Sequence, residues 1–218
     1  DDIARLRLAA TSALFTRRDA VVVASVSCIY GLGSPEEWRE RVLILDVGEE
    51  HDRDLVLRKL IDSQYVRNDA VLGRGRFRVR GDVVEIQPAN QETAYRVSFF
   101  GDEVEQITHF DPVSGEILTK LDNVAIWPAT EYVTSKPTVD RAVGEIRHEM
   151  SERVKELESE GKMLEAHRLR QRTEYDLEML KELGFCNGIE NYSRILEGRP
   201  PGSHPFTLLD YFSNDFVV

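Results

Sequence analysis

Four arginines alternate along one short stretch, Arg74 to Arg80, which reads RGRFRVR. Successive side chains of a β-strand point to opposite faces of a sheet. We therefore expect Phe77 and Val79 to face a core, and Arg78 and Arg80 to point outward together. Like charges on one face repel each other, so the pattern requires an explanation. The complete basic set is Arg67, Arg74, Arg76, Arg78, Arg80 and Arg96.

Three explanations of this arginine set are open. Charged side chains protect an edge strand against pairing with another sheet. Arginine also presents a planar fork that fits a carboxylate or a phosphate, and it is enriched at protein interfaces. Nearby acids (Asp69, Asp82, Glu85 and Glu92) disfavour a broad phosphate track, so the sequence favours a protein partner that carries acidic residues.

The sequence contains none of the common motifs for catalysis or metal binding. There is no GxxxxGK[ST] phosphate loop, GxSxG elbow or HExxH pair. Gly31 and Gly33 form a bare G-x-G, which predicts only a strand-to-helix turn. The five histidines are scattered, and no residues show the spacing of metal ligands. Cys28 and Cys186 are interpreted as small buried fillers, in agreement with a reducing cytoplasm.

The composition limits the number of domains and the kinds of protein that the chain can represent. The chain has 218 residues, 41% of them hydrophobic, which suits one large or two smaller globular domains. Its formal net charge is −11. Dedicated nucleic-acid binders are usually basic, so the charge argues against nucleic-acid binding by the chain as a whole.

The first half of the sequence predicts a mixture of α/β and α+β structure. Residues 1–19 predict a helix with an apolar stripe of Ile3, Leu6, Ala10, Ala13 and Leu14. The run VVVASVS, Val21 to Ser27, is typical of a strand buried in a parallel sheet. A short helix near 36–41, a strand at 42–47 and a helix at 52–64 are expected next. Strands of a small antiparallel sheet follow at 75–81, 83–87, 94–101, 103–109 and 124–127.

The second half predicts a helical hairpin. Ser135 or Thr134 can cap a helix whose first turn contains Pro137. Its core stripe is Ala142, Val143, Ile146, Met150, Val154 and Leu157. Gly161 interrupts the pattern, and a second helix carries Leu164, Leu169, Leu177, Leu180 and Leu183. Gly184 ends that helix, and a short helix is expected within 187–196.

Six stretches resemble, in this order, the UvrB family of bacterial nucleotide excision repair. They are VVVASVSCIYGLGSPEEW, FRVRGDVVEIQPA, RVSFFGDEVEQI, GKMLEAHRLRQRTEYDLEML, GFCNGIENYSR and TLLDYF. The resemblance covers nearly the whole chain and implies a remnant of a P-loop helicase domain, a small antiparallel-sheet domain and a helical domain. Residues 1–41 and 207–218 would belong to helicase domain 1a, 42–133 to a UvrA-binding domain and 134–206 to helical domain 1b.

The resemblance also implies roles for individual residues. Arg67, Arg78, Arg80 and Arg96 would contact UvrA, and Ser98 stands where the family typically has a glutamate. Arg172 and Glu190 would hold the base of a DNA-clamping hairpin, although surface ion pairing would explain them equally well. Tyr192, Ser193 and Arg194 would line the DNA path, or Tyr192 would simply pack into a core.

The resemblance places catalysis outside this chain. The segment would begin after the DNA-clamping hairpin and stop before the Walker B acids. ATP and magnesium would therefore bind only the full-length protein, and this chain would not be an enzyme. Two alternatives stay open: the UvrB-like module of the transcription-repair coupling factor, and a piece that binds DNA in its own right.

Overall fold

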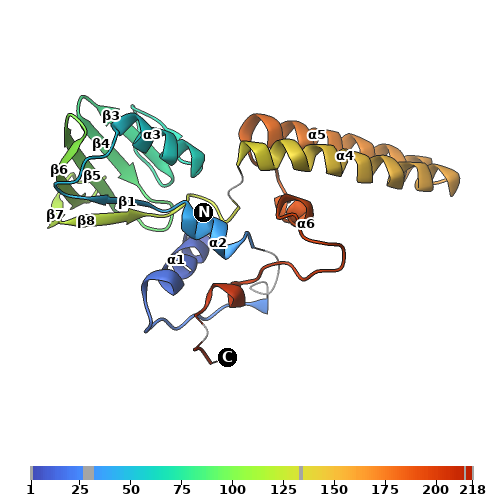
Figure 1. The fold of residues 1–218 in the computed structure, drawn as a ribbon, viewed down its shortest axis with the longest axis horizontal. Helices are drawn as coiled ribbons and strands as arrows, with labels where there is room; N and C mark the ends of the chain where they lie inside the picture. Colours follow the sequence, from blue (N-terminus) through green and yellow to red (C-terminus); the bar gives the residue numbers. More distant parts are fainter. Residues whose placement is uncertain (1, 27–31, 133–134, 214, 218) are drawn as a thin grey trace. The chain divides into compact units, whose positions relative to one another are not determined.

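The computed structural model describes residues 2–26, 32–132, 135–213 and 215–217, and it divides into two compact units (Figure 1). The first unit comprises residues up to 28, 35–133 and 208–218, and the second comprises 29–34 and 134–207. Helices and strands are both present in the first unit, and the second is helical. The mixed fold class predicted from the sequence is confirmed. No helix of the described ranges is both long and apolar enough to cross a membrane.

A six-stranded sheet forms the centre of the first unit, in the order β2-β3-β4-β5-β6-β7. Only β2 and β3 pair in parallel, and the other neighbours are antiparallel. Six strands expected from the sequence (42–47, 75–81, 83–87, 94–101, 103–109 and 124–127) are present within one or two residues, whereas β2 and β7 were not predicted. The strand expected at 124–127 lies outside this sheet. The strands of this sheet are β2 (Val66–Arg67), β3 (Arg76–Arg80), β4 (Val83–Gln87), β5 (Ala94–Phe100), β6 (Glu103–Phe110) and β7 (Ile117–Leu121). A separate two-stranded antiparallel sheet is formed by β1 (Leu43–Asp46) and β8 (Asn123–Ile126).

One face of this sheet is covered by apolar packing. Phe77, Val84 and Val97 are fully buried and belong to a single core with residues of β1, β8 and α3 (Arg53–Asp62). Asp52 caps α3 by accepting hydrogen bonds from the backbone N–H groups of Asp54 and Leu55. The core confirms that Phe77 points inward, and it leaves the opposite sheet face to Arg78, Arg80 and Arg96.

An aromatic cluster joins three helical segments of the first unit to its loops. Phe15 of α1 (Asp2–Thr16) stacks on Trp127, and Trp38 of α2 (Pro35–Glu40) stacks on the same indole with a ring-centre distance of 4.8 Å. Tyr211 of η3 (Leu208–Tyr211) packs against Phe15 at 5.4 Å. Contacts between aromatic rings therefore hold together α1, α2, η3 and the loop that carries Trp127, which are distant in the sequence.

The apolar stripe predicted for the first helix is wrong. Ile3 and Leu6 are 69% and 57% exposed, whereas Leu8, Thr11 and Ser12 form the buried face of α1. The hydroxyls of Thr11 and Ser12 donate to carbonyls one turn back in the same helix, which removes the penalty for burying them.

The buried strand predicted at Val21–Ser27 is also wrong over its described part, residues 21–26. That segment is irregular, and Val21 and Val23 are 90% and 96% exposed. A parallel strand requires hydrogen-bonded neighbours on its ladder, and none of the described strands pairs with this segment. Ser27 and the Gly31 of the predicted turn lie outside the described residues.

The second unit contains an antiparallel helical hairpin, as the sequence predicted (Figure 1). It consists of α4 (Lys136–Ser159) and α5 (Met163–Leu183), which lie side by side. All six residues of the stripe predicted for the first helix are buried. Ser135 caps α4 by accepting from the N–H of Thr138, whereas Thr134 lies outside the described residues. Leu164 and Leu183 of the second predicted stripe are exposed.

Glycines end both hairpin helices where the sequence placed them. Gly161 and Gly184 adopt φ angles of +76° and +69°, a left-handed conformation that favours glycine. After α5 the chain forms η2 (Ile189–Tyr192) and α6 (Ser193–Leu196). This short pair of helices carries Glu190, Tyr192, Ser193 and Arg194, whereas Arg172 lies on α5.

Candidate functional site

A row of charged residues crosses three neighbouring strands on the sheet face opposite the core. Arg78 of β3 lies opposite Glu85 of β4, which in turn lies opposite Arg96 of β5. Arg78 Nε donates a hydrogen bond to Oε2 of Glu85, and Arg96 Nε donates to Oε1 at 2.8 Å. One carboxylate therefore holds two guanidinium groups, which explains how these like charges share a face.

Glu85 is the least accessible member of this row. Its side chain is 7% exposed, compared with 18% for Arg78 and 34% for Arg96. Burial alone would raise the pKa of Glu85, but hydrogen bonds and positive charge from both arginines outweigh it and hold the pKa below its usual value. The carboxylate is thus ionised at neutral pH.

The aromatic ring of Phe110 fixes the second arginine further. The guanidinium carbon of Arg96 lies 4.6 Å from the centre of this ring, in cation–π geometry. Phe110 is 1% exposed and belongs to β6, the next strand of the sheet. Arg96 is consequently held by a carboxylate and by a ring from two different strands.

A second carboxylate, Asp69, holds the edge of the arginine surface. It accepts hydrogen bonds from the guanidinium of Arg67, at 3.0 to 3.2 Å, and from the backbone N–H of Val79 at 3.0 Å. The hydrogen bonds from Arg67 and Val79 lower the pKa of Asp69. Arg80 is exposed and makes no side-chain hydrogen bond or ion pair within the described part of the chain.

Ser98 lies on the same sheet face, at an irregular point of β5. It pairs with Val83 on one side and Gln106 on the other, and the register of β5 and β6 shifts directly after it. In the same cross-strand row, Val83 pairs with Arg80. Of the other two arginines in the set, Arg74 binds Asp2 and Glu92, and Arg76 is exposed.

We define the arginine surface as Arg67, Arg78, Arg80, Arg96 and Ser98. The structure brings these predicted residues onto β2, β3 and β5 of one sheet. Arg78, Arg80, Arg96 and Ser98 share the face opposite the core, whereas Arg67 lies on the edge strand in register with Phe77. Glu85 and Asp69 were expected only as nearby acids, and their hydrogen bonds to these arginines were not predicted. Glu85 could have been paired with Arg78 from the Gly81-Asp82 turn, because a two-residue hairpin turn fixes which residues lie opposite each other.

Two of the predicted residues of the helical unit, Arg172 and Tyr192, contact a buried carboxylate, Asp176 of α5. Its side chain is 7% exposed and accepts a 2.7 Å hydrogen bond from the hydroxyl of Tyr192. Arg172 lies one helical turn away with its Nε 3.8 Å from the same carboxylate, and Glu190 is exposed. Burial and the hydrogen bond to Asp176 raise the pKa of the Tyr192 hydroxyl.

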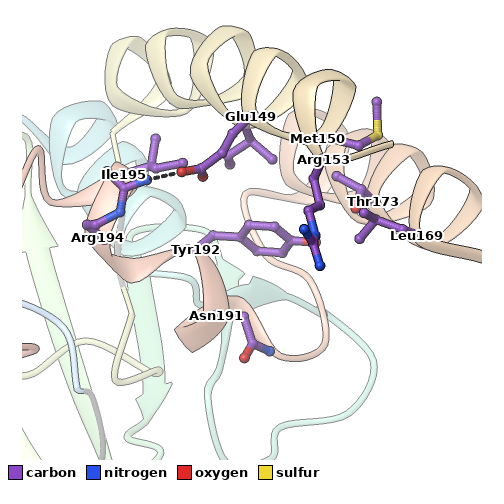
Figure 2. A pocket seen from close by; sticks show the side chains of 10 residues that line it. Glu149, Met150, Arg153, Leu169, Thr173, Asn191, Tyr192, Arg194 and Ile195 are labelled. Carbon is purple, nitrogen blue, oxygen red and sulfur yellow. Dashed lines mark hydrogen bonds and ion pairs between the residues drawn. The ribbon is translucent and has the colours of Figure 1, made fainter. Parts of the chain in front are cut away.

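A pocket of about 200 Å³ lies beside this tyrosine, between the hairpin and the η2–α6 segment (Figure 2). Figure 2 shows Arg194 reaching Glu149 of α4, and the nitrogen-to-oxygen distance is 2.6 Å. Met150 and Leu169 supply apolar lining, and Arg153 also lines the pocket. Two of the predicted residues, Tyr192 and Arg194, thus line one cavity.

The cysteine prediction holds where the structure describes it. Cys186 is fully buried, and burial raises the pKa of its thiol to about 12. Cys28 lies outside the described residues. Among the described residues, no three His, Cys, Asp or Glu side chains are grouped so that they could hold a metal ion.

Two family models match the chain. Residues 43–132 match the UvrB interaction domain, and residues 137–198 match the UvrB third helical domain. The first match contains the whole arginine surface, and the second contains Arg172, Glu190, Tyr192 and Arg194. The chain belongs to the UvrB family.

Curated relatives of this UvrB-family chain include UvrABC system protein B from three bacteria. The proteins of Dehalococcoides mccartyi, Geobacillus kaustophilus and Bacillus subtilis are each 58% identical to it. The matches extend over 218, 219 and 219 residues, and each covers the entire chain and 33% of the relative. The chain therefore spans about a third of the length of these UvrB relatives.

Proposed function

We propose that this chain is the part of a nucleotide excision repair protein that docks UvrA through the arginine surface. The observation that carries the proposal is the row of Arg78, Glu85 and Arg96, which presents guanidinium groups in fixed positions on a sheet face not covered by the apolar core. The UvrB interaction domain match over residues 43–132 supports it.

The arginines retain donors for a partner after binding their own acids. A guanidinium has five N–H donors, and Arg78 and Arg96 each use only Nε in hydrogen bonds to described residues. Arg80 is exposed and adds a further guanidinium group. Against a chain charge of −11, this local excess of positive charge favours a partner surface that carries carboxylates.

A binding experiment with the UvrA of Bacillus subtilis tests the proposal, because that organism's relative is 58% identical to this chain. Arg78→Ala with Arg80→Ala should weaken binding in isothermal titration calorimetry by ~2 kcal/mol or more, the usual effect of truncating interface charge pairs. The far-UV circular dichroism spectrum should stay unchanged.

The matched control removes two positive charges from the other side of the same sheet. Arg58 and Lys59 are exposed on α3, which packs on the core face. Arg58→Ala with Lys59→Ala should leave UvrA binding intact. Equal losses in the two double variants would mean that net charge, rather than the arginine surface, governs docking.

The helical unit is proposed to support DNA handling in the complete protein. Arg172 and Glu190 would hold the base of the DNA-clamping hairpin, and Tyr192 and Arg194 would line the DNA path. Ser193, also predicted there, is buried and accepts a hydrogen bond from Arg199. The pocket beside Tyr192 and Arg194 supports this assignment, because an aromatic ring next to a cation suits a nucleic-acid strand.

ATP hydrolysis is proposed for the complete protein only. The sequence contains no phosphate-binding GxxxxGK[ST] motif, so the residues present do not fit an ATP–magnesium site. Purified chain should release no phosphate from ATP above a buffer control. We further propose that the complete protein is cytoplasmic.

The two alternative functions make different predictions. A DNA-binding piece should bind a short duplex tightly at low salt, with affinity that falls steeply as salt rises. Fluorescence anisotropy measures this directly, and we expect weak binding because of the negative net charge. The name UvrABC system protein B, carried by the relatives, favours UvrB over the transcription-repair coupling factor.

A further inference from the structure

We propose that Glu85 is a positioning residue for docking: it fixes Arg78 and Arg96 before the partner arrives. This inference rests on the proposed function of the arginine surface. It assigns a role to a carboxylate that has the same sign as the partner groups and that would, on charge alone, be expected to oppose binding.

The geometry separates the two oxygens of Glu85. Oε2 accepts from Arg78 Nε and Oε1 accepts from Arg96 Nε, so each oxygen serves one neighbouring strand. A glutamine at this position could accept only one of these hydrogen bonds, because its amide nitrogen is a donor. The carboxylate is therefore required to hold both arginines at once.

Burial shows that Glu85 acts through the arginines. Its side chain is 7% exposed, which leaves almost none of the carboxylate to meet a partner. The arginines lie over it and are more exposed, at 18% and 34%. A partner would contact the guanidinium groups, whose orientation Glu85 sets from below.

Fixing these side chains in advance favours binding. A free arginine loses rotamer freedom when a partner immobilises it, and this loss lowers the affinity. Glu85 holds both side chains in the unbound chain, and the ring of Phe110 restrains Arg96 as well. The competing effect is the negative charge of Glu85, which the two arginines more than neutralise.

The first measurement concerns the unbound chain. The Nε–H groups of Arg78 and Arg96 should give two NMR signals protected from exchange with water. Glu85→Gln should remove the protection of at least one signal. The matched control, Glu105→Gln, removes an exposed carboxylate from β6 of the same sheet and should leave both signals protected.

The second measurement is UvrA affinity by calorimetry. Glu85→Gln should weaken binding about 10-fold, the effect expected from restoring rotamer freedom to two arginines, and Glu105→Gln should have no effect. Equal or tighter binding by Glu85→Gln would overturn the inference and would show that Glu85 only neutralises charge. If the unsubstituted chain did not bind UvrA at all, the docking proposal itself would be overturned. That result is distinct from both outcomes for Glu85→Gln, weaker binding and unchanged or tighter binding.

A third variant covers the case in which Glu85→Gln fails to fold, as judged by circular dichroism. Glu85→Asp keeps the charge and both oxygens but withdraws the carboxylate by one methylene, so that it no longer reaches both arginines. It should lose affinity while Glu105→Asp does not. Full affinity in Glu85→Asp would count against positioning.

Discussion

Arg96 donates a 2.8 Å hydrogen bond from Nε to Oε1 of Glu85, a carboxylate that is almost completely covered by the side chains around it. Since Arg78 binds the other oxygen, the three side chains form one unit across three strands. The stability of this domain and its proposed docking are consequently linked through a single acid.

Stability should depend on the ionisation of Glu85. Its pKa in the folded chain lies below the usual 4.5, so the stabilisation is present above that value and is lost as pH falls through the lower folded pKa. Glu85→Gln should lower the free energy of unfolding at neutral pH by about 1–3 kcal/mol. Urea denaturation at several pH values should show this difference shrinking below pH 4.5.

Removing the hydroxyl of Tyr192 should destabilise the helical unit. Tyr192→Phe leaves the buried carboxylate of Asp176 without its 2.7 Å donor, and Arg172 remains only at 3.8 Å. The expected loss is about 1–3 kcal/mol, the typical effect of leaving a buried polar group unsatisfied. Urea denaturation followed by far-UV circular dichroism measures it. Tyr175→Phe, at a ring that is 61% exposed, should change nothing.

Two glycines of the helical unit should respond in opposite directions to alanine. Gly188 has a φ of +79°, and a Cβ there would approach Asn191 Nδ2 to 2.9 Å, so Gly188→Ala should destabilise by about 1–2 kcal/mol. Gly144 lies inside α4 with open space around it, so Gly144→Ala should stabilise by about 0.5–1 kcal/mol. The same sign for both in thermal denaturation would contradict these backbone assignments.

Cys186 should resist thiol reagents until the chain unfolds. Its pKa of about 12 keeps the thiol protonated at neutral and mildly alkaline pH, and the reactive form is the thiolate. In a Cys28→Ser background, labelling with a disulfide reagent should be slow in buffer and rapid in denaturant. Rapid labelling of the folded chain would show that the residue is accessible.

Local patterns were sufficient to predict most elements of this fold. The hairpin stripe from Ala142 to Leu157 and the turns at Gly81 and Gly101 depend on nearby residues, and the corresponding elements formed as predicted. The strand expected at Val21 did not form, because a strand needs neighbouring strands to hydrogen-bond with, and the residue types of one segment do not specify them. The stripe of α1 was misplaced because Thr11 and Ser12 satisfy their hydroxyls internally.

The candidate site was predictable only in part for a similar reason. Arg78 and Arg80 were evident from their alternation along one strand, whereas Arg67, Arg96 and Ser98 were assigned through the resemblance to the UvrB family. Asp69 and Asp176 contribute through contacts with Val79 N–H and with a tyrosine 16 residues away, which no local pattern specifies. The three-domain division and the roles of individual site residues remain predictions.

The stacked indoles of Trp38 and Trp127 have a practical consequence for spectroscopy. They are the only two tryptophans in the sequence, and both lie in the first unit. Intrinsic emission should thus report the melting of this aromatic junction while staying silent about the helical hairpin. Tryptophan fluorescence reports on the first unit, and far-UV ellipticity reports on the helices. Comparing the two unfolding curves would reveal, without any added label, whether the two units unfold together or one after the other.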